Sequence, residues 1–405
     1  MTLEQLKVVL ESVPGEPRVV ASGNFASPLA LLGVLDGAVS EFKLHMLGAQ
    51  SGIPDRKGVE FETAFVGPGM RRSSRLTYIP SRLSLVPVLF RDHFVPDVVL
   101  LHTSSVFQGK YSLGTETNVL PAAIAAVKAA GGLVIAQANA QMPYTFGDSE
   151  LDADLIDYVV EVDLPLPEKP HVHLNEESEE IGARISALVS DGSTLQLGIG
   201  GIPDSVIAKL QDRRGLRIWT EMFSDGVLGL QRSKALDENQ LITASFAFGS
   251  RELYDWLHKN KSVRMLRTET TNDPSNISKQ QRMTSINAAL QVDLYDQANA
   301  SHVRRHIYSG FGGSTDFIVG ALHSPGGKSF MALASWHKKA DASAIVARLT
   351  ENVTSFQHSH VVTEQGVADC FGHSQSQQAF NLINKAAHPD ARVELTAQAE
   401  EFGLL

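Results

Sequence analysis

Short apolar runs typical of buried strands alternate along this chain with amphipathic helical segments, and this alternation limits the possible fold more than any other feature. In the first part, strands are expected at residues 18–21, 44–47, 98–101 and 133–136, and helices at 27–35 and 121–130. Such an order predicts α/β architecture with mainly parallel sheets.

The same rhythm restarts after a proline-rich stretch at residues 164–170, which predicts an extended linker. A helix capped by Asn175 is expected next, then a strand at 194–197 and a helix with Pro203 at its first position. Further strands are expected at residues 241–246, 263–266, 290–294, 330–333 and 360–363.

A chain of 405 residues with 43% hydrophobic content is long enough to bury two cores. We therefore predict two similar α/β domains, an N-terminal one over residues 1–172 and a C-terminal one over residues 173–405. The formal net charge of −10 and the lack of a basic stripe with interleaved aromatics argue against a nucleic-acid partner.

The single cysteine, Cys370, excludes an internal disulfide framework and favours a reducing compartment. No nucleophile signature surrounds it, so a catalytic role is disfavoured. The first residues lack a basic segment followed by an apolar run, and no run of about 18 apolar residues occurs. We expect a cytoplasmic protein without a membrane partner.

A glycine pattern, G-x-G-G-x-x-D, occurs twice, at residues 198–204 and 310–316. Glycine turns let backbone N–H groups approach phosphates or oxyanions, and the first copy joins an expected strand to an expected helix. A dinucleotide fingerprint is disfavoured because Pro203 replaces its third glycine, and a P-loop because no Lys-Ser or Lys-Thr follows. A purely structural turn remains an alternative.

Glu221 lies between the two copies, at the end of the strand-like run 216–220 and before Met222 and Phe223. A carboxylate in such a position is most often solvated or pairs with a helix terminus. Its apolar neighbours, and its place where α/β sheets bind ligands, favour a desolvated carboxylate with a raised pKa that reacts with electrophiles.

At residues 193–204 and 220–227, the sequence resembles the acetyl-CoA hydrolase/4-hydroxybutyrate CoA-transferase family, whose members are family I-type CoA-transferases. The resemblance continues at residues 285–287, 292–294, 310–317, 362–366 and 387–389, and it is looser in the first part, at 27–29, 62–71, 104–114 and around Asn139. It implies two CoA-transferase-like (NagB/RpiA-type) α/β domains, with the catalytic glutamate in the second.

The resemblance implies that Glu221 attacks an acyl-CoA, giving a mixed anhydride and then a glutamyl-CoA thioester that a short-chain carboxylate resolves. The backbone N–H groups of Gly312 and Gly313 would stabilise the oxyanions. Implied CoA contacts are Gln196, Gly198, Ile199, Gly200, Gly201, Ile202, Asn287, Ser309 and Lys338, and Asn139 would contact the substrate. Asn287 suits a turn-capping role equally well.

CoA is thus expected as a co-substrate, with no prosthetic group. No metal is expected, because His302 and His306 lack a third ligand, and Glu364 is assigned a structural or supporting role. Gln357, Gln378 and Ser314 depart from the family pattern and leave the acid specificity open. A CoA-transferase is the leading hypothesis, an acyl-CoA hydrolase and a non-catalytic CoA- or nucleotide-binding protein are the alternatives, and a homodimer is expected.

Overall fold

The structure, a computed structural model, describes residues 1–170, 174–304, 306–351, 353 and 357–405. It contains two compact units: unit 1 comprises Met1–Lys169, Ile242–Thr271 and Ile307–Gly312, and unit 2 comprises Pro170–Leu241, Asn272–His306 and Gly313–Leu405. The boundary expected between residues 172 and 173 lies outside the described residues.

Unit 1 is built on a seven-stranded sheet in the order β10-β7-β5-β1-β2-β3-β4, in which all neighbours are parallel. The strands are β1 (Arg18–Ala21), β2 (Phe42–His45), β3 (Val59–Thr63), β4 (Leu76–Tyr78), β5 (Val98–Ser104), β7 (Leu133–Asn139) and β10 (Tyr158–Val162). Every residue of β5 is buried, as expected for a central parallel strand covered on both faces.

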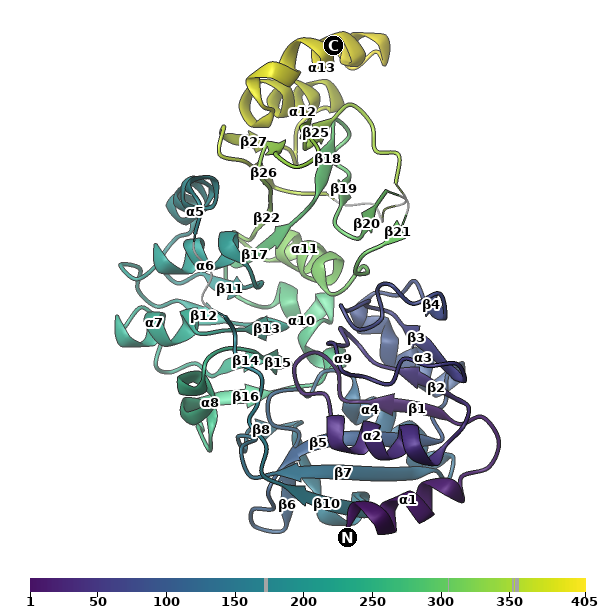
Figure 1. Cartoon of the computed structure of the whole chain (residues 1–405). Coiled ribbons are helices and arrows are strands. Elements are labelled where there is room, and N and C mark those ends of the chain that lie inside the picture. Colours follow the sequence, from purple (N-terminus) through teal and green to yellow (C-terminus); the bar gives the residue numbers. More distant parts are fainter. Residues whose placement is uncertain (171–173, 305, 352, 354–356) are drawn as a thin grey trace. The chain divides into compact units, whose positions relative to one another are not determined.

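Helices cover both faces of this sheet (Figure 1). The helices α1 (Leu3–Glu11) and α2 (Leu29–Ala38) pack in one apolar cluster with Val19. The helices α3 (Val86–Asp92) and α4 (Leu120–Ala129) pack in another with Val20. Because successive strand residues point to opposite faces, unit 1 is a three-layer α/β/α sandwich, and its predicted α/β class is confirmed.

Residues 242–271, which the sequence analysis placed in the second domain, belong to unit 1 because two of their strands extend a small parallel sheet there. This sheet has the order β14-β16-β8. The other elements of unit 1 are β6 (Lys110–Ser112), β8 (Phe146–Gly147), β9 (Glu150–Asp152), β14 (Ile242–Ala244), β15 (Phe246–Ala247), α8 (Arg251–Leu257), β16 (Val263–Met265), α9 (Thr268–Thr271) and two 3₁₀ turns (Leu83–Leu85, Ala153–Leu155).

Unit 2 contains a six-stranded sheet in the order β12-β11-β17-β22-β26-β27. Its strands are β11 (Thr194–Gln196), β12 (Arg217–Ile218), β17 (Met283–Ala288), β22 (Lys328–Ala332), β26 (His360–Val362) and β27 (Val367–Asp369). Only the β26–β27 pair is antiparallel, so mainly parallel pairing, as predicted, holds here too.

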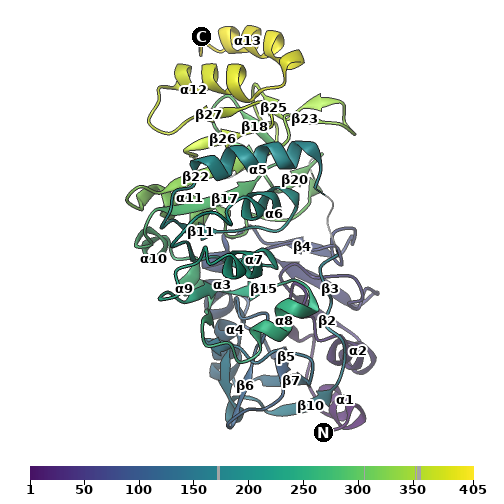
Figure 2. The same cartoon turned by 90° about the vertical axis from the view of Figure 1, so that its left-hand side faces the viewer.

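The helices of unit 2 are α5 (Glu176–Leu188), α6 (Gly201–Ala208), α7 (Gly226–Arg232), α10 (Pro274–Ser278), α11 (Ser314–His323), α12 (Gln375–Asn381) and α13 (Arg392–Glu401), with a π-helical turn (Leu382–Ala386) and a 3₁₀ turn (Pro389–Ala391). Asn175 caps α5, as predicted, by accepting a hydrogen bond from the Ser178 N–H. Figure 2 shows α5 beside α6, where Gly182 leaves room for Ser205.

Short strands complete unit 2: β13 (Met222–Phe223), β18 (Gln291–Asp293), β19 (Ala298–Asn299), β20 (His302–Val303), β23 (Trp336–His337), β24 (Ala342–Ser343) and β25 (Ile345–Val346). In one further strand, β21 (His306–Ile307), His306 ends a segment of unit 2 and Ile307 begins a segment of unit 1. His302 and His306 therefore begin short strands.

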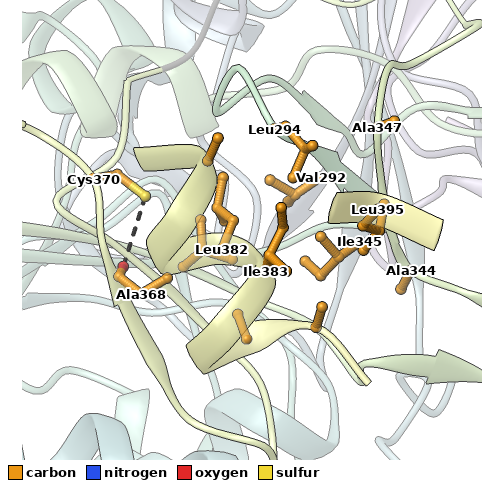
Figure 3. Packing of buried hydrophobic residues seen from close by; sticks show 14 of the residues in the cluster. Val292, Leu294, Ala344, Ile345, Ala347, Ala368, Cys370, Leu382, Ile383 and Leu395 are labelled. Atoms are coloured by element: carbon orange, nitrogen blue, oxygen red, sulfur yellow. Dashed lines mark hydrogen bonds between the residues drawn. The ribbon is translucent and has the colours of Figure 1, made fainter. Parts of the chain in front are cut away.

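A buried cluster joins β18, β22, β25 and β26 to α12 and α13 (Figure 3). Cys370 is part of this cluster, with its Sγ 3.6 Å from the carbonyl oxygen of Ala368. Burial, with a smaller contribution from the charge of Asp296, raises the pKa of the Cys370 thiol far above its usual range. A thiol that stays protonated is a poor nucleophile.

Candidate active site

Glu221 lies in unit 2 between β12 and β13, and hydrogen bonds of Thr220 hold the chain on either side of it. The buried Thr220 hydroxyl accepts a hydrogen bond from the Leu197 N–H at 3.0 Å and donates one to the Met222 carbonyl at 2.8 Å. Leu197 also forms a β-bridge with Met222. The glycine turn that begins at Gly198 is therefore fixed beside the nucleophile candidate.

The Glu221 carboxylate has a polar partner on a different segment of unit 2. The buried Asn272 donates a hydrogen bond from Nδ2 to Glu221 Oε2 at 3.0 Å. Asn272 is followed by Asp273, the N-cap of α10. The Asp273 side chain accepts a hydrogen bond from the Ser275 N–H at 2.7 Å, and Pro274 occupies the first helical position.

Burial raises the pKa of Glu221 to about 7, and the negative charge of Asp316 contributes in the same direction. The hydrogen bond from Asn272 acts against this shift because it stabilises the carboxylate. The side chain keeps some solvent exposure, but the atoms packed around it displace most of its hydration. Near neutral pH, Glu221 is thus a weakly hydrated carboxylate of raised basicity, which suits a nucleophile.

A small apolar cluster holds the segments that carry these groups. Trp219, next to Thr220, packs in it with Ile277 of α10, with Phe317 and Ala321 of α11, and with Met283. This packing fixes α10 and α11 against the segment that leads from β12 to Glu221, so Asn272 and Asp316 are held by the core of unit 2.

Gly313 is the N-cap of α11 and lies against the carboxylate. A Cβ atom at Gly313 would overlap Glu221 Oε2 and Asn272 Nδ2, so only glycine fits beside this pair. The N–H groups in the first turn of a helix have no partner within the helix. Gly313 therefore brings the end of α11 that carries partial positive charge to the Glu221 carboxylate.

Gly312, the other expected oxyanion donor, belongs to unit 1. It has a φ of +58°, packs against the ring of Phe65, and its carbonyl accepts a hydrogen bond from the Leu83 N–H at 2.9 Å. Ser309, an expected CoA contact, is also in unit 1, where its carbonyl accepts a hydrogen bond from the Val66 N–H at 2.7 Å.

The first glycine turn leads into α6, with Gly200 at a φ of +125° as its N-cap. The helix begins at Gly201, so Pro203 occupies the third helical position, and its predicted place at the first position is wrong. The proline is tolerated because the N–H of a third helical residue has no acceptor inside the helix. Ile199, at the tip of the turn, exposes its apolar side chain.

The neighbouring strands β11 and β17 bring two expected CoA contacts together. Gln196 Oε1 accepts hydrogen bonds from the Ile286 N–H at 3.1 Å and from Asn287 Nδ2 at 3.3 Å. Asn287 Nδ2 also donates to Ser285 Oγ at 2.8 Å. The parallel pairing, which sets Gln196 opposite Ser285, explains why side chains 91 residues apart meet.

Lys338 pairs with Glu177 and lines a cavity of about 440 Å³ in unit 2. The same cavity is lined by Glu364, whose carboxylate accepts hydrogen bonds from the N–H and the hydroxyl of Ser335. This contact joins the residues after β22 to those after β26, in keeping with the structural role predicted for Glu364.

Asn139, the expected substrate contact, is buried in unit 1. Its Nδ2 donates to the Leu164 carbonyl at 2.9 Å and lies 3.0 Å from His102 Nε2, while its Oδ1 accepts from the Leu164 N–H at 3.0 Å. Both ends of this amide bind the protein itself and fix the chain after β10.

Two residues beside Glu221 were missed by the sequence analysis. Asp316 ends the second glycine pattern and was given no role, although its motif drew attention to it. Asn272 gave no signal, because nothing in its local sequence separates it from an ordinary residue before a helix cap.

Within the part of the chain that the structure describes, no group of three or more His, Cys, Asp or Glu side chains is arranged to hold a metal ion. The same residues include no helix long and apolar enough to span a membrane.

Known proteins resemble the chain over nearly its whole length. The model of the acetyl-CoA hydrolase/transferase C-terminal domain matches residues 249–399. The 4-hydroxybutyrate coenzyme A transferase of Clostridium kluyveri is 34% identical over 409 residues, which cover 95% of this chain and 94% of that protein. The succinyl-CoA:cyclohexane-1-carboxylate CoA transferase of Geobacter metallireducens is 38% identical over 335 residues, which cover 80% of this chain and 76% of that protein.

A solved structure extends this likeness to three dimensions. The crystal structure of a 4-hydroxybutyrate CoA-transferase from Porphyromonas gingivalis has a TM-score of 0.83 and 30% sequence identity, and the match covers 99% of this chain and 97% of that one. The chain therefore belongs to the acetyl-CoA hydrolase/4-hydroxybutyrate CoA-transferase family, as its motifs predict.

Proposed function

We propose that this protein is a CoA-transferase that moves CoA between an acyl-CoA and a short-chain carboxylate, with Glu221 as the nucleophile. The observation that supports this proposal most directly is the environment of Glu221, whose pKa is raised to about 7 while Asn272 holds Oε2 and the first turn of α11 lies alongside. With Oε2 tethered, Oε1 is the oxygen assigned to the attack.

In the first step, Oε1 attacks the thioester carbonyl carbon, the C–S bond breaks, and a mixed anhydride and CoA thiolate form. The thiolate then attacks Cδ of Glu221, which releases the first carboxylate and leaves a glutamyl-CoA thioester. A second carboxylate attacks this thioester, and the same two steps in reverse yield the new acyl-CoA. One carboxylate replaces another throughout, so the cycle needs no net proton transfer.

Each attack on a carbonyl passes through a tetrahedral oxyanion, for which Gly312 and Gly313 are the proposed donors. Gly313 at the start of α11 combines a backbone N–H with the favourable end of the helix dipole. A single such donor lowers a barrier by about 3 kcal/mol. The turn from Gly198 to Ile202, with Gln196 and Asn287, is proposed to bind CoA, which enters as a co-substrate.

The decisive experiment is to weigh the tryptic peptide formed by residues 218–232 after incubation with acetyl-CoA. This peptide contains Glu221 and no internal lysine or arginine. A CoA adduct on the wild-type peptide, absent from an isosteric Glu221→Gln variant that no longer turns over, is the expected result. Full activity of Glu221→Gln, with no adduct on the wild-type peptide, would refute the proposed nucleophile.

Hydrolysis of the acyl-CoA is the second candidate activity, because the matching family model includes acetyl-CoA hydrolases. Transfer and hydrolysis differ in whether a carboxylate or water attacks the glutamyl intermediate. Formation of propionyl- or butyryl-CoA from acetyl-CoA, compared with free thiol released without an acceptor, separates the two. Dominant thiol release would assign the protein as a hydrolase.

A cytoplasmic homodimer is part of the proposal. The cytoplasmic location is supported by the single, buried cysteine, which needs no oxidising compartment. Light scattering of the purified protein tests the dimer, and fractionation of the source cells tests the location.

A further inference from the structure

Unit 2 contains a second cavity, of about 470 Å³. Its charged lining residues have no part in the chemistry proposed for Glu221. It is lined by Leu290, Gln291, Asn299, His302, Val303, Arg304, His337, Lys339, Ala340, Ala342, Ser343, Ala344, Thr350 and Glu351. Half of these residues belong to the strands β18, β19, β20, β23 and β24, of which Figure 1 labels the first three and Figure 2 labels β23. Its volume suits a small-molecule ligand.

The lining of this cavity is basic. Its described residues include the fixed cations Arg304 and Lys339 and the imidazoles of His302 and His337, and among them Glu351 is the one acid. Among the described residues, neither Arg304 nor Lys339 has an acidic partner within ion-pair distance, whereas Lys338 pairs with Glu177 and Lys209 with Glu179. Unpaired cations on one concave surface create a positive potential that attracts an anion.

The local backbone structure constrains the segments that carry His337, Lys339 and Arg304. His337 and Lys339 belong to the hairpin of β23 and β24, in which His337 lies opposite Ala342. His337 Nδ1 accepts a hydrogen bond from the Ala340 N–H at 3.0 Å, so a proton on the neutral ring is on Nε2, which remains a donor. Arg304 has a φ of +48°, a conformation uncommon for arginine.

The cavity that contains Lys338 offers a contrast within the same unit. Glu176, Glu177, Glu180 and Glu364 line it, and four carboxylates disfavour a phosphate there. Lys338 was expected to contact CoA, but its ammonium is neutralised by Glu177. The adjacent Lys339 has no such partner among the described residues and lines the basic cavity instead.

We propose that the cavity of Arg304 and Lys339 binds the phosphate groups of a nucleotide. Guanidinium and ammonium groups bind phosphate oxygens through charge-assisted hydrogen bonds, and an imidazole N–H adds a directed donor. Two sources share this chemistry: the nucleotide end of the acyl-CoA, which rests on the proposed function, and a free nucleotide, which does not. Leu290, the first lining residue of the cavity in sequence order, lies three residues after Asn287, a proposed CoA contact. This closeness favours the nucleotide end of the acyl-CoA as the source of the phosphates.

Calorimetric titration of the full chain with CoA, adenosine 3′,5′-bisphosphate and ATP tests this proposal without depending on turnover. The variants are Arg304→Gln, Lys339→Gln and the pair combined, with Arg304→Lys to restore the charge. Lys261→Gln is the control, because Lys261 is an exposed cation of unit 1 without a partner in the described part of the chain. Unchanged melting temperatures establish that the variants are folded.

Arg304→Gln and Lys339→Gln are each expected to weaken binding of CoA and of adenosine 3′,5′-bisphosphate roughly tenfold. Arg304→Lys, which keeps the charge at position 304, should bind both ligands nearly as well as the wild type. Lys261→Gln should have no effect. Loss of ATP binding with unchanged CoA binding would keep the phosphate site and assign it to a free nucleotide. Wild-type affinity of the double variant for all three ligands would overturn the proposal. Failure of the proposed function is seen separately, as CoA binding without transfer activity in the wild type.

Discussion

Asn272 Nδ2 donates a hydrogen bond to Glu221 Oε2 at 3.0 Å, across 51 residues of sequence. The two side chains meet because the cluster of Trp219, Ile277 and Phe317 fixes α10 beside the segment that leads from β12 to Glu221. The amide stabilises the charged form of a carboxyl group whose burial favours the neutral form. Asn272 thus limits the rise in the pKa of Glu221 and selects the oxygen that stays free.

Replacement Asn272→Ala is expected to raise the pKa of Glu221 above about 7 and to lower kcat/KM at pH 7 roughly 10- to 100-fold, the usual effect of losing a hydrogen bond to a charged group. The acidic limb of the pH–rate profile should move to higher pH. Asn276→Ala, on the short helix α10 that follows Asn272, is the control. An unmoved acidic limb in Asn272→Ala would show that this hydrogen bond does not set the ionisation of Glu221.

Glu221 should make the protein less stable as the pH rises. Its pKa is raised from 4.5 to about 7, so between these values the folded state binds more protons than the unfolded state, and the free energy of unfolding falls with increasing pH. The full effect is roughly 3 kcal/mol. Glu221→Gln, which cannot ionise, should therefore raise the melting temperature at pH 8 and change it little at pH 4, as differential scanning calorimetry would measure. Equal shifts at both pH values would contradict the raised pKa.

Substitution Gly313→Ala should strongly reduce transfer, because the added methyl group would displace the Glu221 carboxylate or the Asn272 amide. A loss of at least 100-fold in kcat is expected, as for the loss of an oxyanion donor. Gly37→Ala is the matched control, since a Cβ atom there meets no neighbour within 4 Å and alanine favours the helix α2. Steady-state kinetics of both variants provide the comparison, and near wild-type turnover of Gly313→Ala would rule out close packing at this glycine as a requirement.

The parallel sheet of unit 1 was predictable because its central strands β1, β5 and β7 contain continuous apolar runs. The strand β1 coincides with the predicted residues 18–21, whereas β5 continues past the predicted 98–101 through His102, Thr103 and Ser104. These polar residues are buried, which hydropathy does not indicate. The strand β17 escaped prediction for a related reason, since Thr284, Ser285 and Asn287 interrupt its apolar pattern.

The other differences between the predicted and the observed structure arise from contacts between segments that are far apart in the sequence. The strand β16 was predicted, but local sequence does not encode its pairing with β8, which brings residues 242–271 into unit 1. The nucleophile candidate was found because Glu221 lies in a short continuous motif, residues 220–227, between the two glycine patterns. The tether from Asn272 was not found, because it depends on tertiary packing between segments that carry no shared motif.

Asp316→Asn should lower the pKa of Glu221 and move the acidic limb of the pH–rate profile to lower pH. Asp316 is buried at the third position of α11, and its negative charge disfavours ionisation of Glu221. Asparagine has nearly the same size, so the substitution removes the charge while the packing around Phe317 is kept. A less basic carboxylate is also a weaker nucleophile, so the rate at the high-pH plateau should fall several-fold even though more Glu221 is ionised near pH 6. The control is Asp204→Asn at the equivalent position of the first glycine pattern, since Asp204 does not contribute to the pKa of Glu221 and should leave the acidic limb in place. A profile of Asp316→Asn that overlays the wild type, or a shift shared by both variants, would exclude Asp316 as the group that tunes the nucleophile.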